Sequence, residues 1–258
     1  MSGTAKKTLV LAEKPDQARS FVPMLERASG EKFEKAAGYY ESPSYYVSWF
    51  YGHLLEALMP DEYDEKYKEW TFDTLPIFVD ELVYKFRDGV KNQADIILRL
   101  ANSAHTVVCA TDPDREGQGI FDTFFKYYKI QRPVMKRLWA PSLTDKDLDK
   151  AWANMKDLSE YKNLSLAREL RSWSDWLVGM NASHAYTVAT KAKISIGRVR
   201  TPTLALIVER DRTVENYKES FYYKLIGDWG GFRFTYYQDK ECKLEICVVN
   251  YGCWRFEI

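Results

Sequence analysis

The sequence predicts an α/β domain built on a mostly parallel sheet, followed by a helical domain and by the start of an incomplete β domain. Three observations lead to this prediction. Short apolar runs alternate with segments of helical periodicity in the first part of the chain, which is typical of a parallel sheet covered on both faces. Helical segments then follow one another directly, and aromatic and β-branched residues return from Phe221 onward.

The parallel-sheet domain is placed at residues 1–142. Apolar or aromatic stretches within it are expected to form strands, at residues 8–12, 39–50, 105–110 and 134–140. Pro43 divides the second stretch into two short pieces that meet at a turn. Helices are expected between the strands, at residues 15–28, 90–101 and 116–128. The acidic stretch 60–86 lacks periodicity and is expected to be an irregular surface insertion.

The next domain, residues 143–217, is predicted to be helical. Its helices are expected at residues 145–155, 161–192 and 202–217, with no strand between the last two. Residues 218–258 are expected to begin a β domain, with Gly230 and Gly231 as turn residues, that the chain does not complete.

The composition is that of an ordinary globular protein. Of the 258 residues, 46% are hydrophobic and 29% are charged. No apolar run approaches the roughly 18–20 residues that span a bilayer. The apolar stretch at residues 8–12 is also too short for a signal peptide. We therefore expect a cytoplasmic protein without a membrane segment.

Charge is balanced overall but unevenly distributed. The chain holds 37 basic and 37 acidic residues, so its net charge does not indicate nucleic-acid binding. Residues 61–88 contain nine acids and four bases, whereas residues 162–200 contain seven bases and two acids. If one segment binds a polyanion, we expect it to be the second.

The four cysteines predict reduced, intracellular thiols rather than a disulfide framework. Cys109 lies within an apolar run and is expected in the core. Cys242, Cys247 and Cys253 lack the C-x2-C spacing of structural zinc sites and supply three ligands where four are usual. We do not expect a zinc site there.

Three acids recur at every second residue directly after the strand expected at 105–110: Asp112, Asp114 and Glu116. In doubly wound sheets, ligands bind beyond the carboxyl ends of the strands. Carboxylate oxygens are the ligands that Mg²⁺ prefers, and the ion usually keeps several waters. Three acids at this spacing also arise by chance, so the prediction of a magnesium site depends on the strand end that precedes them.

Glu13 and Lys14 follow the first expected strand. If that strand neighbours the one before Asp112, four carboxylates meet, and their repulsion calls for a divalent cation or a raised pKa. One of the acids would then serve as general acid or base, and Lys14 would stabilise charge on a phosphate oxygen. The alternative is that these residues are ordinary solvated charges at strand ends.

Residues 195–211, SIGRVRTPTLALIVERD, place a turn with two arginines before a helix start at Pro202. Backbone amides, hydroxyls and the guanidinium groups of Arg198 and Arg200 together suit phosphate binding. A solvated helix start is the alternative interpretation. Trp173 and Trp176, three residues apart on the preceding helix, are expected in the core rather than as platforms for stacked bases.

Five segments in this order resemble the type IA DNA topoisomerases, most closely those of the bacterial topoisomerase III kind. They are LAEKP at 11–15, GHLLEALMP at 52–60, ATDPDREG at 110–117, DWLVGMNAS at 175–183 and SIGRVRTPTLALIVERD at 195–211. The resemblance covers roughly residues 7–225. It implies a Toprim domain, then part of the helical domain that holds the single-stranded gate segment, then the first strands of the arch.

The resemblance implies an ATP-independent, Mg²⁺-dependent enzyme that cuts one DNA strand, passes another and reseals, with single-stranded DNA as partner and no nucleotide cofactor. Glu13, Asp112 and Asp114 match the family's magnesium ligands. Glu116 completes the acidic triad, and Lys14 matches the lysine that assists transesterification. Positions that contact DNA in the family are matched by His53, Arg171, Ser195, Ile196, Gly197, Arg198, Val199 and Arg200.

Three positions depart from the family's pattern. Gln118 stands where the family often has Glu, His184 where it often has Arg, and Arg200 where it usually has Gln. These departures concern the strength of DNA contacts rather than the fold.

The family's nucleophile is a tyrosine in a Tyr-Pro-Arg context, and no such motif occurs in this sequence. The resemblance also ends after about Thr235, which favours an amino-terminal piece from a truncated or frame-shifted gene. We therefore expect this chain alone to be inactive. The tyrosines near its end are expected to pack in a sheet: Tyr222, Tyr223, Tyr236, Tyr237 and Tyr251.

Two other functions stay open on the sequence. A non-catalytic module that binds single-stranded DNA or a protein partner would carry the same motifs. A different Toprim enzyme, such as a primase or a nuclease, is disfavoured because those families lack the SIGRVRTP segment.

Overall fold

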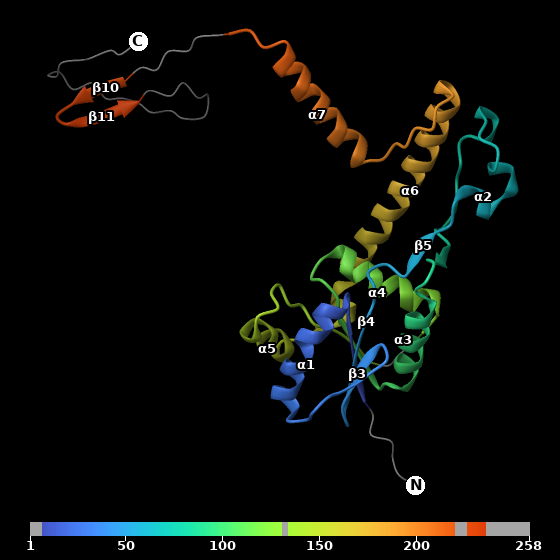
Figure 1. Cartoon of the computed structure of the whole chain (residues 1–258), viewed down its shortest axis with the longest axis vertical. Coiled ribbons are helices and arrows are strands. Elements are labelled where there is room, and N and C mark those ends of the chain that lie inside the picture. The colour runs from blue at the N-terminus through green and yellow to red at the C-terminus, as the bar shows by residue number, and fades with distance from the viewer. Residues whose placement is uncertain (1–6, 131–133, 220–225, 236–258) are drawn as a thin grey trace. The chain divides into compact units, whose positions relative to one another are not determined.

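The computed structural model describes residues 7–130, 134–219 and 226–235 of the chain (Figure 1). The chain divides into two compact units, residues 1–201 and residues 202–258. The first unit holds a sheet domain and the long helix α6 (Lys162–Thr190), and the second holds most of helix α7 (Arg200–Glu215) and a β-hairpin.

A seven-stranded mixed sheet forms the centre of the first unit, in the order β2-β3-β4-β1-β7-β8-β9. Its strands are β1 (Thr8–Ala12), β2 (Glu34–Ala36), β3 (Tyr39–Glu41), β4 (Tyr45–Trp49), β7 (Thr106–Ala110), β8 (Val134–Arg137) and β9 (Lys156–Asp157). The four central strands run parallel, and the strands toward the edges pair antiparallel. The continuous apolar run of β1 suits its central place, because both of its faces are covered.

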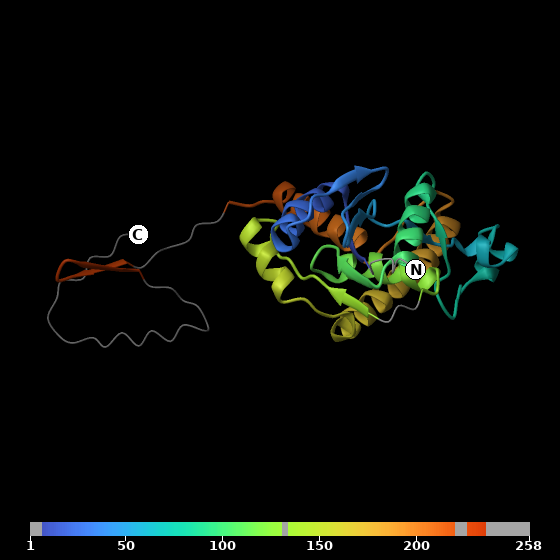
Figure 2. The ribbon, with the colours of Figure 1, turned by 90° about the horizontal axis from the view of Figure 1, so that it is seen from below.

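Helices cover both faces of this sheet (Figures 1 and 2). Helix α1 (Pro15–Ser29) and helix α5 (Asp145–Ala153) pack on one face, whereas α3 (Lys91–Ser103) and α4 (Arg115–Tyr127) pack on the other. Local sequence sets the ends of α1, since a proline occupies its first turn and Gly30 ends it in the left-handed conformation at φ 73°. The predicted α/β fold class is confirmed.

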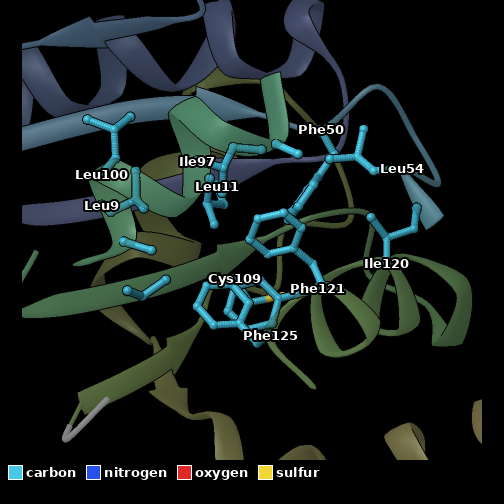
Figure 3. Packing of buried hydrophobic residues seen from close by; sticks show 14 of the residues in the cluster. Leu9, Leu11, Phe50, Leu54, Ile97, Leu100, Cys109, Ile120, Phe121 and Phe125 are labelled. Atoms are coloured by element: carbon cyan, nitrogen blue, oxygen red, sulfur yellow. The ribbon is translucent and has the colours of Figure 1, made fainter. Parts of the chain in front are cut away.

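Alternate residues of the central strands face opposite layers, as the two-residue period of a strand requires. Leu9, Leu11 and Cys109 pack in the layer of α3 and α4, together with Phe121 and Phe125 (Figure 3). The layer of α1 and α5 takes the intervening strand residues, Val10, Ala12, Val108 and Ala110. The strand backbone that leads to the carboxyl ends of β1 and β7 is therefore buried on both faces of the sheet.

The stretch 60–86 is more ordered than its sequence predicts. It contains the short helices α2 (Pro60–Tyr63), η1 (Glu65–Tyr67) and η2 (Phe72–Thr74), and strand β6 (Tyr84–Phe86), which pairs with β5 (Leu55–Ala57). Elements of three or four residues are too short to show periodicity, so they could not be predicted from the sequence.

This insertion packs on α6 through a small apolar cluster that includes Tyr67, Ile77 and Trp176. The side-chain amide of Asn181 bonds to both backbone groups of Ile77, accepting at 2.7 Å and donating at 2.9 Å. The Trp176 indole donates to the Leu58 carbonyl at 2.9 Å. The prediction that Trp176 belongs to the core is confirmed by its burial.

The described part of the second unit contains α7 residues and the hairpin of β10 (Ile226–Trp229) and β11 (Phe232–Thr235). The hairpin turns at Gly230 and Gly231, whose φ angles of 57° and 82° favour glycine. Strands were predicted from Phe221 onward, and these two bear out that prediction. Several residues discussed above lie outside the described residues: Tyr222, Tyr223, Tyr236, Tyr237, Cys242, Cys247, Tyr251 and Cys253.

The helices match their predicted ranges to within a few residues; α6, for example, begins at Lys162 and ends at Thr190. The domain limits placed at residues 142 and 217 stay predictions. None of the helices in residues 7–130, 134–219 or 226–235 combines the length and the apolar composition that crossing a bilayer requires.

Candidate metal and DNA-binding site

Two acids meet at the carboxyl ends of neighbouring strands. Strands β1 and β7 pair in parallel with Ala12 opposite Ala110, so the residues that follow them emerge side by side. The two strands are therefore neighbours, which is the condition that the sequence left open. The Asp112 backbone N–H donates to Oε2 of Glu13 at 3.3 Å, which joins the two strand ends directly.

The Lys14 side chain lies close to both acids of this pair. Its ammonium group lies 3.3 Å from Oε1 of Glu13 and 3.9 Å from Oδ2 of Asp112. Burial raises the pKa of Glu13, the Asp112 charge raises it further, and Lys14 opposes both effects. The hydrogen bond to Glu13 in turn raises the pKa of Lys14, which keeps the ammonium charged.

Asp114 has a local structural role in addition to its position near the pair. It precedes α4 and its Oδ1 accepts a hydrogen bond from the Gly117 N–H at 2.7 Å, which caps the helix start. Gly117 packs so closely on the Asp112 backbone that a methyl group there would overlap the carbonyl oxygen. The tight turn from Asp112 to Gly117 therefore depends on a residue without a side chain.

Glu116 has other neighbours than Glu13 and Asp112. Its carboxylate lies 3.7 Å from Arg168, 3.8 Å from Arg171 and 3.9 Å from the ring of His53. Across residues 7–130, 134–219 and 226–235, no group of three or more His, Cys, Asp or Glu side chains is arranged to hold a metal ion. Asp112 and Glu116 therefore belong to two different groups of side chains and do not surround a single point.

The remaining pair of carboxylates still fits Mg²⁺. This ion is usually held by one or two carboxylates together with waters and substrate phosphate oxygens, and it does not require an all-protein cage. Glu13 and Asp112 supply carboxylate oxygens as hard donors, and the Asp112 backbone N–H links the two residues through its bond to Glu13. Asp114 follows two residues later and has one carboxylate oxygen outside its capping bond.

Two polar side chains that were not predicted as site residues form hydrogen bonds to Glu13 and Asp112. Gln17, on the first turn of α1, accepts from the Glu13 N–H at 2.7 Å and donates to Oδ1 of Asp112 at 3.0 Å. Arg137, at the end of β8, is fully buried and donates to the carbonyls of Thr111 and Asp112 at 2.9 and 2.6 Å. A charged residue in the middle of the strand expected at 134–140 was the only signal for Arg137, and Gln17 had none.

The second place is a groove of about 470 Å³ beside α6, here called the arginine groove, in which three acids, Glu56, Glu116 and Asp175, accompany the basic side chains. The arginines and the histidine come from segments far apart in the sequence: His53, Arg87, Arg168 and Arg171. The structure thus brings the predicted DNA contacts His53 and Arg171 together. Burial, and next the charge of Arg168, lower the pKa of His53. Arg87 and Arg168 were not predicted as site residues.

The turn Ser195–Arg200 is fastened to α6 by side-chain hydroxyls. The Ser183 hydroxyl accepts from the Ile196 N–H at 2.8 Å and donates to its carbonyl at 3.3 Å. Within the turn, Arg200 donates to the Ser195 hydroxyl at 3.1 Å, and the Gly197 N–H donates to Oγ1 of Thr201 at 3.2 Å.

Arg198 leaves this turn and joins Arg171 around one acid. Its guanidinium lies 2.9 Å from Asp175, which is itself 3.5 Å from Arg171. Arg198 and the exposed Val199 line a second groove of about 400 Å³ together with Arg115 and Arg171. Arg171 lines both grooves. The predicted basic turn therefore borders the second groove, which adjoins the first at Arg171.

The departures from the family's pattern at Gln118 and His184 point into the protein. Gln118 is fully buried and donates to Oδ1 of Asp122 at 3.0 Å. His184 is buried under the insertion, where its ring stacks on Trp70 with 4.8 Å between centroids and an interplanar angle of 15°. Among the departures, only Arg200 presents its side chain on the basic turn.

Two protein-family models match the chain. One, described as the Toprim domain, matches residues 8–141, and the other, described as DNA topoisomerase, matches residues 159–246. The chain belongs to the type IA DNA topoisomerase family. This topoisomerase chain carries the Glu13–Asp112 pair within its Toprim match, and Arg168, Arg171 and Arg198 within the second match.

Curated proteins named DNA topoisomerase 3 are similar to this type IA chain. Those of Bacillus licheniformis and Bacillus cereus are 35% identical over 237 and 224 residues, and that of Staphylococcus haemolyticus is 34% identical over 237 residues. The matches cover 91%, 84% and 91% of this chain, but 32%, 29% and 32% of the relatives. The chain thus spans about a third of the length of these relatives.

A solved structure shares the fold. The full-length topoisomerase I from Thermotoga maritima matches with a TM-score of 0.55 at 18% sequence identity, over 88% of this type IA chain and 34% of that protein. At this identity the likeness concerns the arrangement of the backbone alone.

Proposed function

We propose that this chain supplies the metal-binding half and part of the DNA-binding surface of a type IA topoisomerase reaction. That reaction is an ATP-independent, Mg²⁺-dependent cleavage, passage and resealing of single DNA strands, in the cytoplasm. One observation carries the proposal: Glu13 and Asp112 adjoin at neighbouring strand ends, with Lys14 within 3.9 Å of both.

Each residue of this group has a part in the proposed chemistry. Glu13 and Asp112 would hold Mg²⁺, with Asp114 as a further ligand through its second oxygen. The bound ion would stabilise negative charge on the phosphodiester during transesterification. The Lys14 ammonium, whose side chain is 62% exposed, is free to reach a non-bridging phosphate oxygen. Glu116 would pair with the arginines beside the DNA, in competition with its phosphates, rather than bind the ion.

The arginine groove is proposed to hold single-stranded DNA. His53, Arg171 and Arg198 project from three separate segments into the grooves beside α6. Guanidinium groups suit phosphate because they donate paired hydrogen bonds, and binding through them releases counterions from the DNA. We therefore expect affinity that falls steeply with salt and varies little with base sequence.

The strand-cutting step requires a nucleophile that forms a covalent link to DNA. In the family this is a tyrosine in a Tyr-Pro-Arg context, and the sequence contains no such motif. We propose that the chain by itself neither cuts nor reseals DNA. Incubation with end-labelled single-stranded DNA and Mg²⁺, followed by denaturation, should give no labelled protein. An adduct that disappears on replacing one tyrosine would contradict this part of the proposal.

Calorimetric titration with Mg²⁺ tests the metal site. The Asp112→Asn variant should bind Mg²⁺ at least about tenfold more weakly than the parent, because an amide is a poorer ligand for a hard cation. Asp73→Asn is the matched control, since Asp73 is an exposed acid in η2, away from the strand ends. Equal binding by the parent and Asp112→Asn would place the metal elsewhere and overturn the proposal.

A further inference from the structure

The side chain of Gln17 connects the two strand ends that carry the acids. Gln17 lies on the first turn of α1 and is only 8% exposed. Its carbonyl oxygen accepts from the backbone N–H of Glu13 at 2.7 Å, and its amide nitrogen donates to Oδ1 of Asp112 at 3.0 Å. A single amide therefore contacts the backbone after β1 and the carboxylate after β7.

The orientation of this amide follows from its two partners. A backbone N–H can only donate, and an ionised carboxylate can only accept, so the oxygen of Gln17 must face Glu13 and its nitrogen must face Asp112. The torsion that turns an aspartate carboxylate is broad. A hydrogen bond from a buried, oriented donor to one oxygen restricts it. The second oxygen, Oδ2, is left facing Lys14 at 3.9 Å.

Arg137 restricts the backbone of the same residue. One guanidinium nitrogen donates to the Asp112 carbonyl at 2.6 Å, and the other donates to the carbonyls of Cys109, Thr111 and Leu138 at 3.1, 2.9 and 3.2 Å. The main chain of Asp112 is therefore fixed by β8, and only the rotation of its carboxylate depends on α1.

We propose that Gln17 is a positioning residue for the metal site. It holds one oxygen of Asp112 and thereby presents the other, next to Glu13, to Mg²⁺. This inference rests on the proposed function, in which Asp112 is a ligand, and adds a residue that acts through that ligand. Partners of this kind orient metal-binding side chains, and their loss typically lowers metal affinity by about 10–100-fold.

A purely structural role for Gln17 makes a different prediction. The bond from the Glu13 N–H resembles those that stabilise helix starts, so its loss alone would lower the stability of the protein without changing the metal affinity of the folded state. Metal affinity and stability must therefore be measured separately, the latter without metal.

The test compares Gln17→Met with Gln93→Met. Both replace a buried glutamine by an unbranched apolar side chain of similar size, and Gln93 bonds to the Gly38 and Trp49 carbonyls instead of to an acid. Mg²⁺ titration calorimetry should show about 10–100-fold weaker binding for Gln17→Met and unchanged binding for Gln93→Met. Urea unfolding without metal identifies the conditions in which each variant is folded.

Two further variants keep the outcomes distinct. Gln17→Asn retains an amide but is one methylene too short to span both partners, so it should also bind Mg²⁺ more weakly, and it serves if Gln17→Met does not fold. Parent-like Mg²⁺ affinity in a folded Gln17 variant, with affinity lost in Asp112→Asn, would overturn the positioning role alone. Parent-like affinity in Asp112→Asn as well would overturn the proposed function itself.

Discussion

The two halves of the candidate site are built in opposite ways. The acids Glu13 and Asp112 stand on strand ends buried from both sides, and buried Gln17 and Arg137 fix their surroundings. The guanidinium of Arg198 is held by Asp175 at a surface where 46% and 39% of the two side chains are exposed. We therefore expect metal affinity to depend on the core, and DNA affinity to depend on surface charge and salt.

Substitution of Gly117 should have the largest effect, and it tests the metal-binding half of the site. In Gly117→Ala the new methyl group would overlap the Asp112 backbone, which buried Arg137 prevents from moving away. We expect the free energy of unfolding to fall by about 1–3 kcal/mol. We also expect Mg²⁺ affinity to fall at least about tenfold, because a displaced ligand no longer meets the ion. Urea unfolding and calorimetry measure the two quantities.

The matched control is Gly119→Ala, two residues further along α4. There the methyl group would meet the side chain of Arg168 rather than backbone. Arg168 is itself buried, so stability should fall here too, but Mg²⁺ affinity should stay at the parent value because the Asp112 backbone is not displaced. Equal losses of Mg²⁺ affinity in the two variants would break the distinction between a fixed and an adjustable half.

On the DNA side, removing one positive charge should weaken binding without changing its selectivity. Arg198→Ala should lower affinity for single-stranded oligonucleotides of every sequence by a similar factor and reduce the slope of log affinity against log salt by about 1. Fluorescence anisotropy at several salt concentrations measures both. A loss confined to one sequence would show that Arg198 reads bases.

Removal of the acid among the arginines should have a smaller effect of opposite sign. Glu116→Gln leaves Arg168 and Arg171 without the carboxylate that lies 3.7–3.8 Å from them. We expect oligonucleotide affinity to rise about two- to fivefold, the scale of an exposed ion pair, with Mg²⁺ affinity unchanged. Glu169→Gln, which removes an exposed acid paired with Lys126, is the control. Weaker Mg²⁺ binding in Glu116→Gln would assign that acid to the metal after all.

The smallest effect concerns His184, which contacts Trp70 and Thr74 of the acidic insertion. Burial lowers its pKa below the 6.5 of an unfolded histidine, so the unfolded chain binds its proton more readily. The stability that this group contributes is complete above pH 6.5 and is lost as the pH falls from there toward the lower folded pKa.

Urea unfolding at pH 7.5 and pH 5.5 checks this sign. The parent should lose more stability than His184→Gln over that interval, by at most about 1.4 kcal/mol per pH unit. His53 is present in both proteins, so its contribution cancels in the comparison. An equal loss in the two would show that His184 titrates alike in the folded and unfolded chains.

The sequence by itself determined the sheet, its main helices and the position of the acids at strand ends. Apolar runs such as TLVLA at residues 8–12 mark buried parallel strands, because both faces of such strands need apolar side chains. The proline that opens α1 and the glycine that follows it mark helix ends through backbone conformation alone. The residues of these signals are close together along the chain, so a local pattern suffices to find them.

Only the tertiary structure decided how the acids are shared out. Asp112, Asp114 and Glu116 look equivalent in the sequence, yet the first adjoins Glu13, the second caps α4 and the third faces two arginines. Which neighbour each acid meets depends on the turn around Gly117 and on helices from elsewhere in the chain. Gln17, Arg137 and the Trp70–His184 stack went unpredicted for the same reason: each works through a partner far away in sequence, and periodicity carries no information about such partners.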